Sequence, residues 1–170
     1  FVFPSVAPVE VRLDAGPVSG SPPWFATSVV HGTRNLLAAS FALAEGEDVS
    51  GLVVWYSDRA GRLEGRLLDE LNRPVPGLAV LVFGTDRRYW VAGSPYLPQP
   101  EQAASDGTFT FVGLPPGEYF VAALVAVDLP MLRDPAFLER VTGVATKVEL
   151  KRGEPTKLDF RVNVGRSPAF

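Results

Sequence analysis

Any catalytic chemistry in this chain would have to involve its only histidine, His31. A Ser-His-Asp triad would combine it with a serine such as Ser28 or Ser57, but neither serine lies in the G-x-S-x-G context of a nucleophile elbow. A catalytic zinc site needs three protein ligands, commonly several histidines, and the chain has no cysteine to replace them. His31 precedes Gly32, which predicts a surface turn. We therefore expect no triad, no metal centre and no cofactor.

Two acidic clusters are the next candidates, Glu45 with Glu47 and Asp48, and the pair Asp69 and Glu70. A glycosidase needs two carboxyl groups across a cleft, one of them with a raised pKa. Both clusters fall in predicted turns, where water would solvate them. Loop carboxylates also suit Ca²⁺, although the spacing of an EF-hand is absent. Solvated loop charges are the favoured interpretation, and the sequence predicts a protein that is not an enzyme.

A Lys–Asn isopeptide crosslink, which some surface sandwiches form beside a buried acid, is a further candidate. The sequence carries no family motif for this bond, and its lysines are typical of solvent-facing residues near the last strands. The groups available for it are Lys147, Lys151 and Lys157 with Asn35, Asn72 and Asn163.

Aromatic side chains offer binding rather than catalysis. Tyr89 and Trp90 follow a charged stretch, and Tyr96 lies in the long loop after them. Exposed rings of this kind can stack on a sugar or contact a protein. The alternative is that Tyr89 and Trp90 close the edge of the core. We favour the core and keep a glycan as an alternative partner.

Composition narrows the classes of partner. The chain has 170 residues and a net charge of −3, and its lysines and arginines are scattered, which disfavours nucleic-acid binding. Its longest apolar run, residues 120–127, is far shorter than the ~20 residues of a spanning helix. Because 46% of the residues are hydrophobic, the apolar surplus must lie in a core or an interface. A start at Phe1 without methionine predicts a processed product or a segment of a longer protein.

Glycine and proline, 16 of each, separate short runs rich in valine, leucine and aromatic residues, which is typical of an all-β protein. In the first part of the chain, Val9, Val11 and Leu13 alternate with charged residues and predict a strand with one apolar face. The ranges 24–30 and 52–57 also predict strands. Residues 36–43 fit either a strand or a helix.

After residue 60 the strand pattern restarts. The uninterrupted apolar run at 78–83 predicts a strand in the centre of a sheet. Asp134 followed by Pro135 predicts the start of a short helix that ends at Gly143. The other expected elements are strands at 63–69, 89–91, 108–112 and 118–127, a proline-rich loop at 94–104, and a final hairpin of 147–150 with 158–164.

A short pattern of strand, Gly-Glu turn and strand occurs twice. Gly46-Glu47 precedes the strand at 52–57, and Gly153-Glu154 precedes the strand at 158–164. The spacing differs by one residue. The pattern predicts that residues 1–59 are the back half of an earlier copy of the unit at 60–170. The alternative is that Gly-Glu is simply a common turn.

Residues 63–69 and 74–80 resemble the opening of a carboxypeptidase regulatory-like domain. Residues 105–111 and 113–119 resemble its second signature, with Asp-Gly before Phe and Leu-Pro-Pro-Gly-Glu-Tyr after it. The resemblance extends over residues 60–164. It implies a transthyretin-like sandwich without catalytic residues of its own. Such domains are appended to secreted peptidases, outer-membrane receptors and bacterial surface proteins, often in tandem.

Together these features predict an all-β fold. Residues 60–170 are expected to form a transthyretin-like (Ig-like) β-sandwich with one short helix. Residues 1–59 are expected to form an N-terminal arm and a smaller, partial β-sandwich unit. At that length a domain is marginal alone, so we expect its open edges to be covered by the larger unit or by another subunit.

The leading functional interpretation is a non-catalytic extracellular module, a bacterial cell-surface protein or filament subunit joined through β-strand addition by its N-terminal arm. Its partners would be other copies or neighbouring domains of the same protein. The alternative is an adaptor or a carbohydrate- or protein-binding module of a larger secreted enzyme or outer-membrane receptor. The expected location is extracellular or in the cell envelope. The candidate contact residues are Val9, Val11 and Leu13 of the arm and Tyr89, Trp90 and Tyr96 of the loop region.

Overall fold

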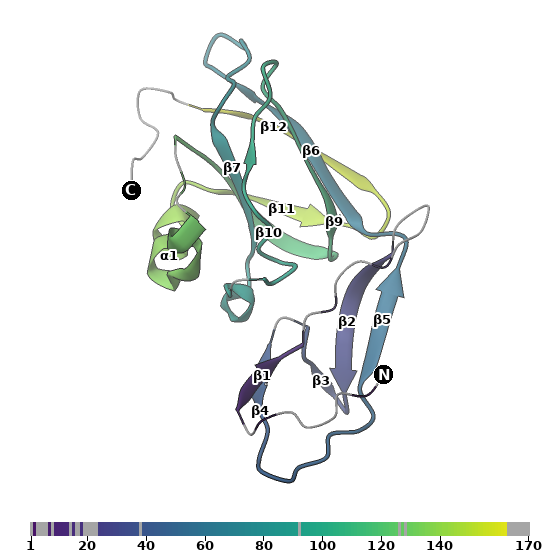
Figure 1. The fold of residues 1–170 in the computed structure, drawn as a ribbon. Helices are drawn as coiled ribbons and strands as arrows, with labels where there is room; N and C mark the ends of the chain where they lie inside the picture. Colours follow the sequence, from purple (N-terminus) through teal and green to yellow (C-terminus); the bar gives the residue numbers. More distant parts are fainter. Residues whose placement is uncertain are drawn as a thin grey trace.

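The structure is a computed structural model of the chain, and it describes residues 2, 7, 9–13, 15, 18, 24–37, 39–91, 93–125, 127 and 129–162. The fold is all-β with one α-helix, as the sequence predicts. Strand pairing among the described residues forms two groups, one within 9–57 and one within 61–162, and none crosses between them. Figure 1 shows the small N-terminal unit at one end of the larger sandwich. The domain boundary near residue 59 stays a prediction.

The first sheet of the larger unit contains the strand predicted to be central. All six residues of β7 (Ala79–Gly84) are buried, because one face of the strand meets the second sheet and the other meets the helical layer. This explains why its sequence is a continuous apolar run without alternation. The sheet has the order β11-β10-β7-β8, in which β7 lies between β10 (Gly117–Leu124) and β8 (Glu101–Gln102), and β11 (Thr146–Leu150) pairs with β10.

The second sheet packs face to face against the first and completes the sandwich. Its order is β12-β6-β9, formed by β6 (Gly61–Leu68), β9 (Thr108–Leu114) and β12 (Pro155–Arg161). Alternate residues of each strand point into the space between the sheets, as expected for half-buried strands. The core between the sheets includes Leu63, Leu67, Val80, Val82, Phe109, Phe111, Tyr119 and Val121.

A helical layer covers the other face of the first sheet. The predicted helix is confirmed as α1 (Pro135–Thr142), preceded by the 3-10 helix η2 (Leu129–Arg133). Asp134 Oδ1 accepts a hydrogen bond from the Ala136 amide at 2.9 Å and caps the helix, and Pro135 occupies its first turn. Its apolar face meets alternate residues of β7 and β10 in a second core that includes Leu81, Phe83, Ala122, Leu124, Phe137, Leu138 and Val141.

The final two strands do not form the predicted hairpin. β11 pairs with β10 in the first sheet, whereas β12 pairs with β6 in the second, and that pairing is parallel. The intervening turn, with Gly153 at φ +70°, therefore carries the chain across the sandwich. The parallel pair is close-fitting at Gly65, where a Cβ would overlap the carbonyl oxygen of Leu158.

The small unit has two short sheets around its own core. β1 (Glu10–Arg12) pairs with β4 (Ser40–Ala42), and the other sheet has the order β3-β2-β5. This second sheet consists of β2 (Phe25–His31), β3 (Arg34–Asn35) and β5 (Val53–Ser57). Four buried residues form the centre of the core, Ala26, Val29, Leu36 and Leu37.

The Gly-Glu turns behave alike in the two units. Gly46 has φ +75°, and the chain passes through it from β4 in one sheet to β5 in the other, just as it passes through Gly153 from β11 to β12. The pairing of the following strand differs, because β5 is antiparallel to β2 and β12 is parallel to β6. The internal repeat therefore stays a prediction. The similar Gly-Glu turns support it, whereas the different pairing of β5 and β12 does not.

Local elements differ from the sequence prediction in four places. Residues 89–91 are not a strand, because Asp86 accepts from the Arg88 amide and caps the 3-10 helix η1 (Arg87–Tyr89). The loop at 94–104 contains the short strand β8. β10 ends at Leu124, three residues before the predicted end. The stretch 36–43, for which the sequence left strand and helix open, contains the strand β4, and its described residues form no helix.

Candidate interaction surface

The N-terminal arm is part of its own unit over residues 9–13. Val11 lies opposite Phe41 in the β1–β4 ladder, and the Val9 carbonyl accepts from the Leu43 amide at 3.2 Å. Leu13 packs against the small core, whereas the Val9 side chain is 52% exposed. Residues 10–12 therefore already pair within their own chain, and strand addition to a neighbouring sheet by the N-terminal arm stays a prediction. The alternating residues form a strand that pairs with β4 of the same chain. Residues 1, 3–6 and 8 of the arm lie outside the described residues.

The aromatic candidates close the core rather than form a binding platform. Trp90 is 3% exposed, and its indole Nε1–H donates to the Gly84 carbonyl at 2.6 Å. The ring of Tyr89 stacks on that of Tyr96, with 4.1 Å between ring centres and 13° between planes, and Tyr119 lies 6.0 Å further along. Tyr96 lies between two rings and Tyr89 is stacked on one face, so these side chains pack mainly with one another, and a glycan partner stays a prediction.

Tyr96 lies where the two units meet. It packs against the core between the two large sheets and also against the core of the small unit. Burial raises the pKa of its hydroxyl to about 12. Two further contacts join the units: Phe25 lies against Gly113 of β9, and the Arg12 guanidinium lies beside Gly93. The predicted interaction residue Tyr96 is therefore a contact within this chain.

An exposed apolar strip on β5 was not singled out by the sequence. Val54 and Tyr56 point towards the small core, whereas Val53 and Trp55 are 47% and 59% exposed on the opposite face. Val30, opposite Val53 on β2, continues this face and is half-buried. Residues 52–56 are all apolar, so alternation gave no sign of which side chains face solvent. The sequence did contain one signal: a small unit has little core, so a strand that is apolar on both faces must expose one of them.

The backbone of β5 is also unpaired along one edge. Both backbone polar groups of Val29 point to the β3 side of the sheet, since its amide donates to Asn35 Oδ1 at 3.2 Å and its carbonyl accepts from the Leu36 amide at 2.6 Å. Backbone directions alternate along antiparallel strands, so the neighbouring β2 residues bond to Val53 and Trp55. Val54 then turns its N–H and C=O to the outer edge, where β5 has no strand partner among the described residues.

The acid–base candidates are not brought together. His31 is exposed at one end of β2, while Ser57 pairs with Phe25 at the other end, six residues away along the strand, or ~20 Å. Ser57 Oγ accepts from the Arg59 amide at 2.9 Å. Glu47 accepts from the Ala44 amide at 2.8 Å and so braces its own turn. Among the described residues no three metal-ligating side chains gather at one point.

The candidates for an isopeptide bond have other partners. Asn35 Oδ1 accepts from two backbone amides, those of Val29 and Leu37. Asn72 Oδ1 accepts from the Arg161 guanidinium at 3.1 Å. The Lys147 ammonium lies 5.2 Å above the ring of Phe120. Asn163 lies outside the described residues. These contacts assign Asn35 and Asn72 to local backbone and strand-surface hydrogen bonds rather than to a crosslink.

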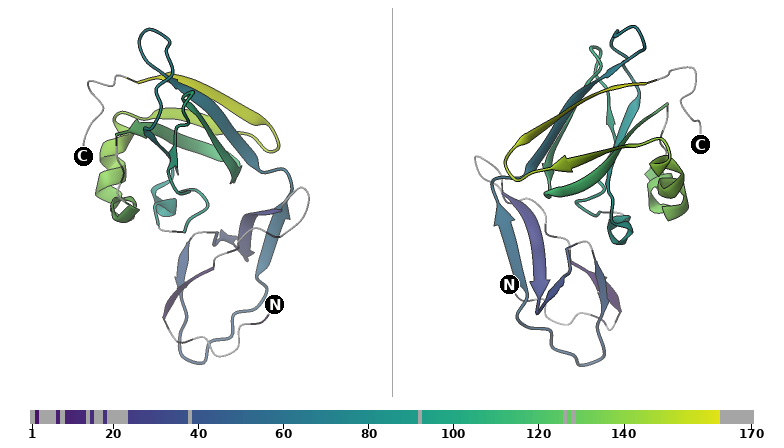
Figure 2. Two further views of the ribbon diagram at one scale, coloured as in Figure 1. Left: turned by 45° about the horizontal axis from the view of Figure 1, so that its top comes forward. Right: turned by 180° about the vertical axis from the view of Figure 1, so that it is seen from behind.

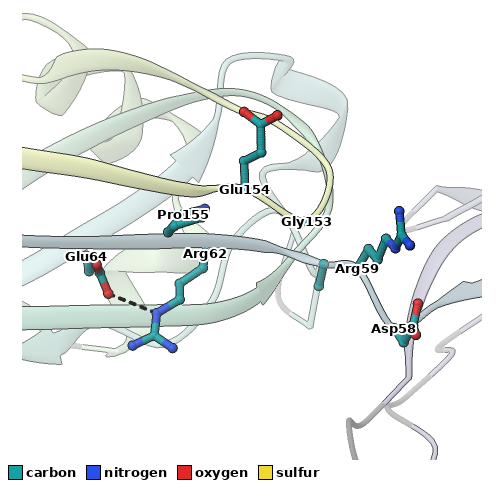
Figure 3. A pocket seen from close by; sticks show the side chains of 8 residues that line it. Asp58, Arg59, Arg62, Glu64, Gly153, Glu154 and Pro155 are labelled. Atoms are coloured by element: carbon teal, nitrogen blue, oxygen red, sulfur yellow. Dashed lines mark hydrogen bonds and ion pairs between the residues drawn. The ribbon is translucent and has the colours of Figure 1, made fainter.

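A shallow cavity of about 440 Å³ lies where the two units join. Figure 3 shows Arg59 and Glu154 pointing away from the pair formed by Arg62 and Glu64, so the charged side chains do not meet at a common point. Arg62 and Glu64 form an ion pair at 3.0 Å across its wall. Gly153 packs against the aliphatic part of Arg59 at its rim. The described residues of its lining therefore show no convergent set of groups that could act on a substrate.

Comparison with known proteins shows similarity in fold and none in sequence family. No family model and no curated protein matches the chain, so the resemblance to the carboxypeptidase regulatory-like family stays a prediction. Among solved structures, the TIE protein of Bacillus anthracis is 18% identical over 82% of this chain and 24% of its own, with a TM-score of 0.41. The streptococcal ancillary pilin is 10% identical over 82% of this chain and 44% of its own, with a TM-score of 0.44.

A 5-hydroxyisourate hydrolase of Klebsiella pneumoniae is 16% identical over 60% of this chain and 84% of its own, with a TM-score of 0.36. Several further matches are major, backbone or minor pilins. The chain covers between 24% and 44% of the length of the first solved structures that it matches. Identities and TM-scores at this level assign no function to this chain. Within the described residues, no helix is both long and apolar enough to cross a membrane.

Proposed function

We propose that the chain is a non-catalytic structural module of a bacterial extracellular or cell-envelope protein, which assembles with copies of itself or with neighbouring domains. The observation that carries the proposal is the exposed apolar surface of the small unit, where Val53 and Trp55 face solvent on an edge strand. Val9, Val18 and Trp24 of the same unit are exposed as well. Apolar surface of this kind is stabilised when a partner covers it.

The larger sandwich serves in this proposal as a stiff support for the small unit. Phe25 and Tyr96 tie the two units together, so a contact made on one unit is transmitted to the other. In this proposal the apolar contacts of Phe25 and Tyr96 restrict hinging between the two units. This suits a module that must hold a defined spacing along a surface protein.

Strand addition by the N-terminal arm is not part of this proposal. Glu10–Arg12 already pair with β4, and adding this segment to another chain would first break that ladder. In this proposal assembly uses instead the apolar part of the small unit that the described residues leave exposed.

Sedimentation velocity of the complete chain over a wide range of concentration tests this function. We expect the average mass to rise above the 18.3 kDa of one chain as concentration increases. Replacing exposed apolar residues of the small unit by serine should lower this association, while Val112→Ser in the larger unit should leave it unchanged. A chain that stays at the mass of one copy throughout, alone and when mixed with the domains that adjoin it, would contradict the proposal.

A further inference from the structure

We propose that the free edge of β5 pairs with the same edge of a second copy, with the two strands antiparallel and centred on Val54. This inference rests on the function proposed above and names the partner and the geometry of the contact. β5 is an edge strand on the side of the small unit away from β1 and β4, as both views in Figure 2 show. The partner is therefore a second copy of this chain, and the interface is symmetric.

The backbone supplies the hydrogen bonds for this pairing. Val54 turns its N–H and C=O to the free edge, because Trp55 and Val53 bond to β2. With Val54 of each copy opposite the other, the two residues exchange both backbone hydrogen bonds. The flanking positions 53 and 55 then form pairs without backbone hydrogen bonds, in which side chains approach most closely.

The side chains match in the same register. Antiparallel pairing about residue 54 places Val53 of each copy opposite Trp55 of the other, on the exposed face of the joined sheet. Each exposed apolar residue of the strip thus gains an apolar neighbour, and an aromatic side chain beside a β-branched one is a favourable cross-strand pair. Val30 continues the row on β2, next to Val53. The symmetric pair therefore leaves neither residue of the strip without a neighbour.

Charge favours this pairing as well. β5 carries no charged side chain from Val53 to Ser57, so two copies meet without like charges in opposition. The register carries Asp58 of one copy next to Ser50 of the other rather than next to a second Asp58. β12, also at the edge of a sheet, presents exposed Lys157, Asp159 and Arg161, which protect an edge from pairing. β5 lacks such protection.

The first test compares the mass of three chains by sedimentation velocity. We expect the wild-type chain to form a dimer. Trp55→Lys should weaken it at least ~10-fold in dissociation constant, because it removes both Trp–Val pairs and adds two charges. Val112→Lys is the matched control, since Val112 is 61% exposed on the edge strand β9, and it should dimerise like wild type. Equal dissociation constants for the two variants would overturn the inference, and thermal unfolding verifies that each is folded.

The second test fixes the register by disulfide formation, which is clean because the chain has no cysteine. We expect a mixture of Val53→Cys and Trp55→Cys chains to crosslink, because these residues lie opposite one another at ~4.5 Å between Cα atoms. Each variant alone should crosslink poorly, since its own two cysteines would be diagonal at ~7–8 Å, beyond the reach of a disulfide. Crosslinking in either variant alone that equals or exceeds crosslinking in the mixture would overturn the register.

The outcomes separate this inference from the function on which it rests. A chain that associates, but whose association is unchanged by Trp55→Lys and whose cysteine mixture does not crosslink, assembles through another surface. In that case the β5 pairing is wrong and the proposed function stands. A chain that remains a single copy and binds no neighbouring domain contradicts both.

Discussion

The ring of Phe25, in the small unit, lies directly against Gly113 of β9 in the larger sandwich. A Cβ at residue 113 would overlap Cε1 of that ring, and the backbone of Gly113 has φ +81°, which favours glycine. The absence of a side chain at residue 113 is thus what lets Phe25 reach the larger unit. A single glycine therefore lies both at a register shift in the β6–β9 ladder and at a contact between the two units.

Gly113→Ala should therefore lower the free energy of unfolding by about 2–5 kcal/mol, from backbone strain and from displacement of the Phe25 ring. Gly46→Ala is the matched control, because Gly46 has φ +75° but no atom near its would-be Cβ. It should cost only the strain, about 1–2 kcal/mol. Urea denaturation measures both values, and equal losses for the two variants would show that Phe25 does not fill the space beside Gly113.

Gly65 tests the parallel ladder of β6 and β12. A Cβ at this position would overlap the Leu158 carbonyl, so β12 would have to shift away and break its ladder with β6. We expect Gly65→Ala to cost more than about 3 kcal/mol or to prevent folding. Gly84→Ala meets only the Tyr96 side chain at 3.2 Å and should cost less, as thermal unfolding of the two variants would show. A Gly65→Ala chain as stable as Gly84→Ala contradicts the close approach of β6 and β12.

Tyr119 carries a buried hydrogen bond at the crossover before β10. Its hydroxyl donates to the Pro115 carbonyl at 2.7 Å, and the side chain is fully buried. Tyr119→Phe leaves that carbonyl without its partner and should cost about 1–2 kcal/mol in chemical denaturation. Tyr89→Phe changes a half-buried tyrosine of the same ring stack and should have little effect. The same cost in both variants would mean that the hydrogen bond adds nothing.

Tyr96 should make stability fall at alkaline pH. Burial raises its pKa from 10.0 to about 12 in the folded chain, with smaller contributions from the charges of Tyr89 and Asp86. Above pH 10 the unfolded chain loses this proton while the folded chain keeps it, so the unfolded state is favoured as pH rises from 10 to 12. Unfolding free energies measured across that range should decline less steeply in Tyr96→Phe. An identical pH dependence in both chains would contradict a buried, neutral Tyr96.

Much of the fold follows from local signals in the sequence. The apolar run of β7 requires burial on both faces, and Asp134 with Pro135 specifies the start of α1, so these elements could be predicted. The parallel pairing of β12 with β6 could not, because alternation indicates which face of a strand is buried but not which strand it joins. The turn at Gly153 fits a hairpin as well as a crossing between sheets.

The candidate surface was harder to predict than the fold. Trp90 was correctly favoured as a core residue, because an aromatic ring beside a long apolar strand has a core to enter. Val53 and Trp55 were missed, since an unbroken apolar run contains no polar residues to mark its outer face. Only the burial of Val54 in a small core shows which side of β5 remains exposed. An exposed apolar surface of this kind arises because the core of the small unit is too small to bury both faces of the strand. The size of that core cannot be read from a local sequence pattern.

The parallel ladder between β6 and β12 also determines how the sandwich responds to tension. The small unit is attached at Gly61, where β6 starts, and the chain leaves β12 at Arg161, the opposite end of the ladder. Pulling these two points apart slides the strands past each other in shear. All seven residue pairs between Arg62 and Leu68 then resist together instead of opening one by one. Forced unfolding is governed by the rate of this rupture, so the sandwich is built to withstand stretching along its chain.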